Sequence, residues 1–330
     1  MKTLALLILS VLFSTSCLDS KQHTEASTYV FKDADHFYAM LALLPEAKTY
    51  KDTLQILHES YFDKASAGLK TYFEYERNTN KRDLEQAYYN IIKSYPKYFE
   101  SQKQLFLEAK NHTSTYTINL NKIKEKYPQA EFQPTYFSMG FFNTPGQMIY
   151  PNTVFIGLEA SLKTDSTDYS EFSDRFAWLK QEQGDYKSLG YTIVHEHLHT
   201  LQNNNLDDYT ILTQTITEGA AVFLTAYFCG ETSLVGSGGI DQVMVDYEKE
   251  NQTTVWKEFQ KDLATSENSS AWFWNEDSKY PYSMGYYMGY LICKSFYEQS
   301  TDKEEALKTL IEVKNPLSIY EQSSYSSNSL

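Results

Sequence analysis

Apolar residues recur at three- and four-residue spacing from Phe31 to about Lys126. This spacing is typical of helices that bury one face and leave the other to solvent. It predicts a helical N-terminal part over residues 29–126, and no cluster of chemically active residues stands out there. The clearest helical segments in this part are Tyr50–Tyr61, Asp83–Ser94 and Tyr98–Lys126.

The pattern changes after Pro128. Pro134–Phe142 and Thr153–Leu158 are rich in aromatic and β-branched residues, and a turn signal, Asn143–Gly146, follows the first of them. They predict two strands that form a small hairpin or sheet. Helical spacing returns further on, so the chain is expected to have an α+β, mainly α fold. Residues 127–318 would form its second part and 319–330 a flexible tail.

The segment from Tyr186 to Gln202 predicts a helix with two neighbouring stripes of residues. One stripe is apolar and consists of Tyr191, Val194, Leu198 and Leu201. The adjacent stripe is polar and consists of His195, His199 and Gln202. Because residues four apart stack on one helical face, the two histidines are expected to project side by side where the helix borders the core.

Residues 195–199 match the pattern H-E-x-x-H. On a helix, this spacing lets His195 and His199 bind one zinc ion while Glu196 acts as a general base. The alternative is a polar helix face with solvated histidines. His197, about 200° round the helix from His195, points away from the metal. It is expected behind the ligands or in solvent, and is not counted as a ligand.

Glu218 is the candidate third ligand, with eighteen residues between it and His199. It lies in Ile216–Leu224, which predicts a second helix, and the loop Asn203–Asp208 would let this helix fold back against the first. Gly219 and Ala220 leave room for close helix approach and for the metal. Two histidines and a glutamate make a catalytic zinc site with an open water position, one zinc per chain. The alternative is that Glu218 is a surface residue in a first helical turn.

The start of the chain has the pattern of an export signal. A basic beginning, the apolar run Leu4–Phe13 and small residues precede Cys17, which predicts a signal peptide over 1–16. The pattern resembles a bacterial lipobox, in which Cys17 would carry lipid and 17–28 would form a polar tether. The alternative is an ordinary signal peptide with Cys17 incidental. We expect an exported protein, lipid-anchored to the cell envelope at the periplasmic face of the outer membrane or at the cell surface.

The composition of the chain argues against some classes of binding partner. The net charge of −14, from 43 acidic and 29 basic residues, argues against nucleic acid and against adhesion to anionic lipid. No later apolar run reaches the roughly 18 residues of a membrane span, so the lipid would be the only membrane attachment. Cys229 and Cys293 either pair or are buried thiols. Nothing in the sequence indicates an oligomeric state.

The metal motif with Glu-Gly-x-Ala eighteen residues later resembles the gluzincin clan of zinc metallopeptidases. A wider likeness is to a family of predicted zinc-dependent proteases, found largely in Bacteroidetes lipoproteins and related to the gliding-motility lipoprotein B group. The segments that carry this likeness are Tyr136–Asn143, Phe155–Glu159, Val194–His199, Thr217–Ala221 and Met284–Tyr290.

This resemblance implies a zincin-like helical core that hydrolyses a peptide or protein substrate. Gluzincins commonly supply an oxyanion donor from a later helix, here Tyr286 or Tyr287, although this helix could equally serve for packing alone. They often bind substrate along an edge strand, here Pro134–Phe142 or Thr153–Leu158. Trp256, Trp272 and Trp274 are interpreted as core or cleft-lining aromatics.

Two other functions remain open. The gliding-motility likeness allows a non-catalytic or weakly catalytic structural lipoprotein of a gliding or secretion machine, built on a peptidase-like scaffold. The intact Glu196 argues against it, because a scaffold does not need a general base. Carbohydrate binding is a third possibility, supported only by the abundance of tyrosine, 28 residues, and tryptophan.

Overall fold

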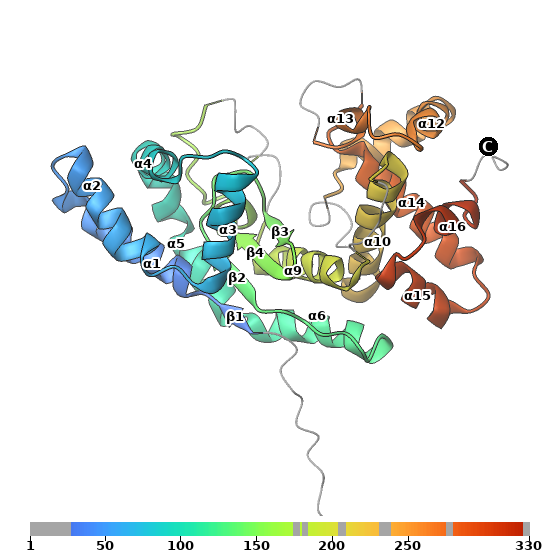
Figure 1. Ribbon diagram of the computed structural model, residues 1–330, viewed down its shortest axis with the longest axis horizontal. Coiled ribbons are helices and arrows are strands. Elements are labelled where there is room, and N and C mark those ends of the chain that lie inside the picture. Colours follow the sequence, from blue (N-terminus) through green and yellow to red (C-terminus); the bar gives the residue numbers. More distant parts are fainter. Residues whose placement is uncertain are drawn as a thin grey trace, which may run out of the picture.

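The computed structural model describes residues 28–173, 179, 184–203, 209–230, 239–274 and 280–325. It is mainly helical with one small four-stranded sheet (Figure 1), so the expected α+β, mainly α fold is confirmed. Residues 1–27, with the predicted signal peptide and Cys17, lie outside the described residues. None of the helices in the described part has the length and apolar character needed to cross a membrane.

Helices dominate the part before the sheet, as predicted. They are α1 (Lys32–Leu43), η1 (Leu44–Glu46), α2 (Tyr50–Leu57), the π-turn η2 (His58–Phe62), α3 (Ala67–Asn78), α4 (Leu84–Ser94), α5 (Pro96–Asn111) and α6 (Thr113–Lys126).

The single helix predicted over Tyr98–Lys126 is wrong, because the chain breaks at His112 between α5 and α6. The Nδ1–H of His112 donates to the carbonyl oxygen of Glu108 at 2.7 Å. This is the carbonyl that the backbone N–H of residue 112 would use in a continuous helix. The imidazole also stacks on Tyr186, with ring centroids 3.7 Å apart. The break therefore depends partly on a residue distant in sequence.

The sheet has the strand order β1 (Tyr29–Val30), β2 (Thr135–Ser138), β4 (Thr153–Gly157), β3 (Gly146–Ile149). β2 is parallel to both of its neighbours, whereas β3 is antiparallel to β4. The two predicted strands correspond to β2 and β4, but they do not form a hairpin with each other. The hairpin is made by β4 and the unpredicted β3, and β3 is an edge of the sheet.

Buried Glu159 shapes the segment between β2 and β3. Its carboxylate accepts the backbone N–H groups of Gly140 at 2.7 Å and Phe142 at 3.0 Å. Phe142 has a left-handed backbone, with φ of 56°, which a bulky residue adopts only when its surroundings hold it there. Burial raises the pKa of Glu159 to about 7. This carboxylate thus helps to turn the chain from an interior strand toward the edge strand.

The helix α9 (Tyr186–Leu201) joins the two halves of the molecule (Figure 1). It contacts β3, β4, α5 and α6 on one side and α10 (Ile211–Cys229) and α15 (Lys303–Glu312) on the other. The remaining helices are α7 (Leu158–Ser161), α12 (Gln242–Asp262), α13 (Ser269–Trp272), α14 (Met284–Gln299) and α16 (Pro316–Glu321). Buried apolar residues form one continuous cluster from Phe31 to Tyr320, which spans both halves.

The segment predicted as a flexible tail begins inside α16. Ile319 and Tyr320 belong to this helix and are buried in the common core. Residues 326–330 lie outside the described part of the chain. Packing against α10 and α14 therefore orders the first residues of this segment.

α10 and α14 cross at two glycines. A Cβ atom on Gly219 would lie 2.1 Å from the carbonyl carbon of Gly289, and one on Gly289 would lie 2.1 Å from the carbonyl oxygen of Thr215. The close helix approach predicted at Gly219 is thus to α14, and the neighbouring backbones leave no space for a methyl group.

Replacing Gly219 with Ala is expected to lower the free energy of unfolding by about 1–3 kcal/mol, because the two backbones must move apart. Chemical denaturation of the variant beside the wild type measures this change. The direction of the change serves as an internal control, because replacing Gly with Ala in a helix without such a contact raises the free energy of unfolding by up to about 1 kcal/mol. A variant as stable as the wild type would show that the helices separate without cost.

Candidate metal centre

α9 carries the H-E-x-x-H motif and is held on both sides. The helix begins at Tyr186 because the Asp185 carboxylate accepts the backbone N–H groups of Lys187 and Ser188, at 2.9 and 3.0 Å. Its second half is buried almost all the way round. His195 and Glu196 are each 7% exposed and His199 is 9% exposed. The motif therefore lies within packed structure, and the solvated helix face considered above is ruled out.

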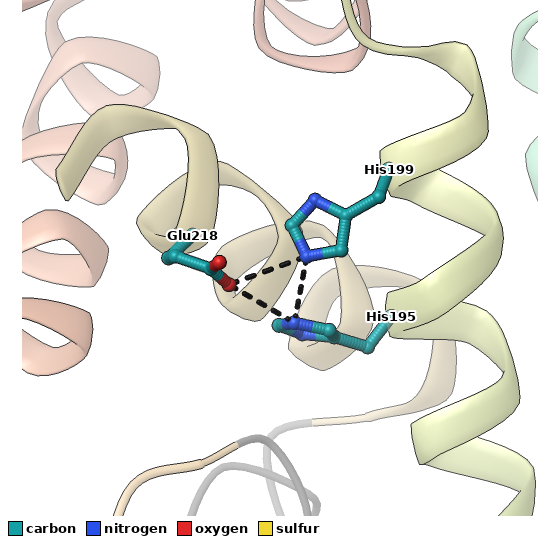
Figure 2. Close-up of side chains that lie close together, drawn as sticks. All are labelled: His195, His199 and Glu218. Carbon is teal, nitrogen blue, oxygen red and sulfur yellow. Dashed lines mark hydrogen bonds and ion pairs between the residues drawn. The ribbon is translucent and has the colours of Figure 1, made fainter. Parts of the chain in front are cut away.

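Glu218 of α10 meets the two histidines of α9. Figure 2 shows the three side chains converging, with the imidazole Nε2 atoms and one carboxylate oxygen facing one another. The two Nε2 atoms are 3.0 Å apart. Glu218 Oε2 lies 3.3 Å from Nε2 of His195 and 3.2 Å from Nε2 of His199. The structure thus brings together the three predicted ligands.

The size of this triangle fits a tetrahedral zinc ion. Ligands at about 2.0–2.1 Å from zinc, at tetrahedral angles, lie about 3.3 Å from one another. Glu218 Oε2 is buried and, among the described residues, has no hydrogen bond of good geometry, although both nitrogens are near. A buried carboxylate oxygen in this state is well suited to a cation. Within the described part of the chain, His195, His199 and Glu218 are the group of side chains that lie close enough together to hold one metal ion.

The charges of the three side chains also favour a cation. Burial alone would lower the pKa of His199, but the Glu218 carboxylate outweighs it and raises this pKa to about 9. Burial alone would raise the pKa of Glu218, but the two imidazoles bring it well below its usual range. The cluster therefore retains positive charge beside the carboxylate. A divalent metal would supply that charge in place of the proton.

Glu196 is held beside the edge strand. Burial raises its pKa, and the nearby backbone N–H of Met148 on β3 partly opposes this shift. Gly146 permits this contact, because a Cβ atom there would lie 2.6 Å from Thr192 Cγ2 and 2.9 Å from Glu196 Cγ. The carboxylate next to the cluster of candidate ligands thus packs against the edge strand, and its raised pKa favours proton uptake.

His197 faces away from the cluster, as predicted, but not into solvent. It is fully buried, with Nε2 2.9 Å from Thr135 Oγ1 and its ring packed edge-on against Phe132. Burial lowers its pKa to about 3. Of the two placements expected for this residue, the solvent one is wrong because the start of β2 packs over this side of α9.

The two candidate tyrosines of α14 separate in space. Tyr286 lies at the cluster, with its ring centroid 6.4 Å from that of His195 and its hydroxyl close enough to Glu218 for this carboxylate to contribute to its raised pKa. Burial raises its pKa well above the usual value, so the hydroxyl stays protonated. Tyr287 instead stacks on Tyr290 and lies near Glu248. The structure therefore brings only Tyr286 to the predicted ligands.

A family model described as predicted Zn-dependent protease (DUF2268) matches residues 139–314, more than half of the chain. The chain belongs to this family. No curated protein and no solved structure matches the chain. All three candidate ligands, Glu196 and Tyr286 lie within the matched residues. The likeness to Bacteroidetes lipoproteins and the gliding-motility group is not tested by this match and stays a prediction.

Two features of the candidate site were not expected from sequence. The Met148 N–H that lies near Glu196 is a backbone group, so its residue type gives no signal. Trp274 is 56% exposed, and its side chain lies close enough to the hydroxyl of Tyr286 to lower the pKa of that group. Trp256 and Trp272, by contrast, are fully buried core residues. The only sequence signal for this contact was the presence of a tryptophan shortly before the tyrosine-rich segment Met284–Tyr290.

Replacing His197 with Gln is expected to make stability less sensitive to acid. The folded protein keeps His197 neutral down to pH about 3, whereas the unfolded chain protonates it below about 6.5. The unfolded state therefore binds the extra proton between these values, and stability falls as the pH falls. In wild type without metal, His197 alone therefore lowers the free energy of unfolding by up to about 1.4 kcal/mol for each unit by which the pH falls. Denaturation at pH 4 to 6 measures both slopes, and equal slopes would contradict a neutral buried imidazole.

Proposed function

We propose that this chain is a zinc-dependent peptidase that binds one zinc ion through His195, His199 and Glu218 and uses Glu196 as general base. The observation that carries the proposal is the compact triangle of the three ligand atoms, with the Glu196 carboxylate anchored on the same helix. Membership of a family of predicted Zn-dependent proteases supports the same activity. Three protein ligands leave one position open, as in catalytic zinc sites.

When bound, zinc supplies a water whose pKa falls toward about 7 and a positive charge that polarises the substrate carbonyl. Glu196 accepts the proton of the attacking water and returns it to the leaving amine. Its side chain packs closely against Gly146 of β3, and its raised pKa favours accepting that proton. The buried surroundings strengthen these charge interactions by limiting access of bulk water.

Tyr286 is the proposed donor to the oxyanion that forms at the attacked carbonyl. Its hydroxyl lies by Glu218, and the Glu196 charge is close enough to help raise its pKa. A phenol that stays protonated can donate a hydrogen bond to developing negative charge. Tyr287, which packs against Tyr290, has no such place and is not proposed for this role.

The substrate is proposed to pair with β3. The sequence suggested Pro134–Phe142 or Thr153–Leu158 for this role, but β2 and β4 each have a strand on both sides. β3 has a strand partner on one side only among the described residues, and its Met148 contacts Glu196. An extended peptide that adds to this edge would pass beside the general base.

The cellular setting is proposed from the sequence alone. Export, lipid attachment at Cys17 and a place in the bacterial cell envelope follow from the pattern at the start of the chain. The substrate would then be a peptide or protein outside the cytoplasm. Metabolic labelling with a fatty acid, in wild type and in Cys17→Ser, tests the anchor separately from the chemistry.

The test of the function is metal analysis of the purified full chain with a digest of a mixed peptide library, for wild type and for Glu196→Gln. One zinc per chain, with cleavage by wild type alone, supports the proposal. One zinc per chain without cleavage by either protein would favour the structural lipoprotein of an envelope machine. A chain that binds no zinc would refute the proposed metal site.

A further inference from the structure

Gln202 lies at the end of α9, three residues after His199. Its backbone is extended, with φ of −72° and ψ of 155°, so the chain leaves the helix at this point. Its backbone N–H still bonds the Leu198 carbonyl at 3.2 Å. The side chain is buried and contacts both α9 and α10. The helical stripe that carries the two histidines thus ends in an amide.

The orientation of this amide follows from its two partners. Nε2 of Gln202 donates to the backbone carbonyl oxygen of Thr217 at 2.8 Å, and Oε1 lies 2.7 Å from Nδ1 of His199. A carbonyl oxygen only accepts, so the NH₂ end must face Thr217. The oxygen end must then face His199. Because Oε1 also only accepts, Nδ1 of His199 carries the proton.

This proton assignment determines which nitrogen of His199 is available to a metal. In a neutral imidazole with hydrogen on Nδ1, the lone pair is on Nε2. Nε2 is the atom that faces His195 and Glu218. The second bond of the amide reaches Thr217, the residue directly before Glu218. One side chain therefore connects the ligand of α9 to the backbone beside the ligand of α10.

We propose that Gln202 is a positioning residue of the metal centre, which holds His199 with its Nε2 lone pair toward the metal and ties it to the segment that carries Glu218. This inference rests on the proposed zinc site, but not on peptide hydrolysis. Partners that orient metal-binding imidazoles typically contribute 10- to 100-fold to metal affinity.

Gln102 offers a matched control. It is also buried, and its Nε2 donates to the Leu162 carbonyl at 2.6 Å and to the Tyr98 hydroxyl at 2.8 Å. These bonds join α5 to the segment after α7, and none reaches a candidate ligand. Removing this amide removes hydrogen bonds of the same kind from the same degree of burial. A general loss of stability would therefore appear in Gln102 and Gln202 variants alike.

The experiment measures the zinc dissociation constant of the full chain by competition with a chelator, for wild type, Gln202→Met, Gln202→Glu and Gln102→Met. Methionine keeps the length of the side chain but can neither orient the imidazole nor bond Thr217. We expect Gln202→Met to weaken zinc binding about 10- to 100-fold. Gln202→Glu should weaken it less, because a carboxylate still accepts from Nδ1–H. Gln102→Met should lower the melting temperature and leave zinc affinity within about twofold, as expected for a distant site.

Several results would overturn the inference. Zinc affinity in Gln202→Met equal to that of wild type would show that the amide does not position His199. An equal loss in Gln102→Met would assign the effect to stability, and a Gln202→Glu variant as weak as Gln202→Met would contradict the proton assignment. A wild type that binds zinc but cleaves no peptide would refute the hydrolytic function and leave this comparison intact. A wild type that binds no zinc would overturn both.

Discussion

Glu196→Gln is expected to reduce kcat/KM for peptide cleavage by about 10²–10⁴-fold, the usual contribution of a general base. The amide has nearly the same shape as the carboxylate and can keep the packing against Gly146, so the edge strand should stay in place. It cannot take a proton from the attacking water. Steady-state kinetics on a peptide cleaved by the wild type measure the loss, with zinc content determined on the same samples.

Glu248→Gln is the matched control for this variant. Glu248 is also a buried glutamate that accepts one N–H, from the Trp256 indole at 2.9 Å, and it lies on α12. Its replacement should leave kcat/KM close to the wild-type value. A Glu196→Gln enzyme that cleaves as fast as the wild type, with zinc bound, would show that another group moves the proton.

Glu218→Ala is expected to weaken zinc binding by more than about 100-fold, beyond the 10- to 100-fold that loss of an outer partner costs. The variant keeps only His195 and His199, and two imidazoles do not complete the three-ligand set of a catalytic zinc site. It also removes the carboxylate that raises the pKa of His199. Chelator competition measures the affinity, and peptide cleavage should be lost together with the metal.

His197→Gln serves as the control for the loss of zinc. His197 lies between the two histidine ligands in sequence, yet it packs against Thr135 and Phe132 on the other side of α9. This variant should bind zinc as the wild type does. If Glu218→Ala kept its zinc, or if His197→Gln lost it, the assignment of ligands from the triangle in Figure 2 would be wrong.

Short-range regularities account for the parts of the structure that sequence patterns predicted well. Helical periodicity placed His195 and His199 on one face of a helix over Tyr186–Gln202, and α9 covers Tyr186–Leu201. A second helix was predicted around Glu218, and α10 covers Ile211–Cys229. Helix formation depends mostly on residues within a few turns, so these elements are visible in the sequence.

Strand pairing was predicted less well for a physical reason. A strand pattern gives the residues that alternate between two faces, but not the partner strand. β2 and β4 were recognised as strands, yet their parallel pairing and the position of β3 at the edge depend on contacts between distant segments. Because pairing with a substrate needs a free sheet edge, this strand order makes β3 the proposed substrate-binding strand in place of β2 or β4.

The sequence by itself determined which side chains could form a metal site, since residue types and helical spacing specify two imidazoles, a base and a carboxylate. Only the tertiary structure decided which other residues surround these four side chains. It turned Tyr286 toward the cluster and Tyr287 away, covered His197 with β2, and placed the Gln202 amide between two helices. These outcomes depend on how separate elements pack, and the spacing of residues along one helix carries no information about its neighbours.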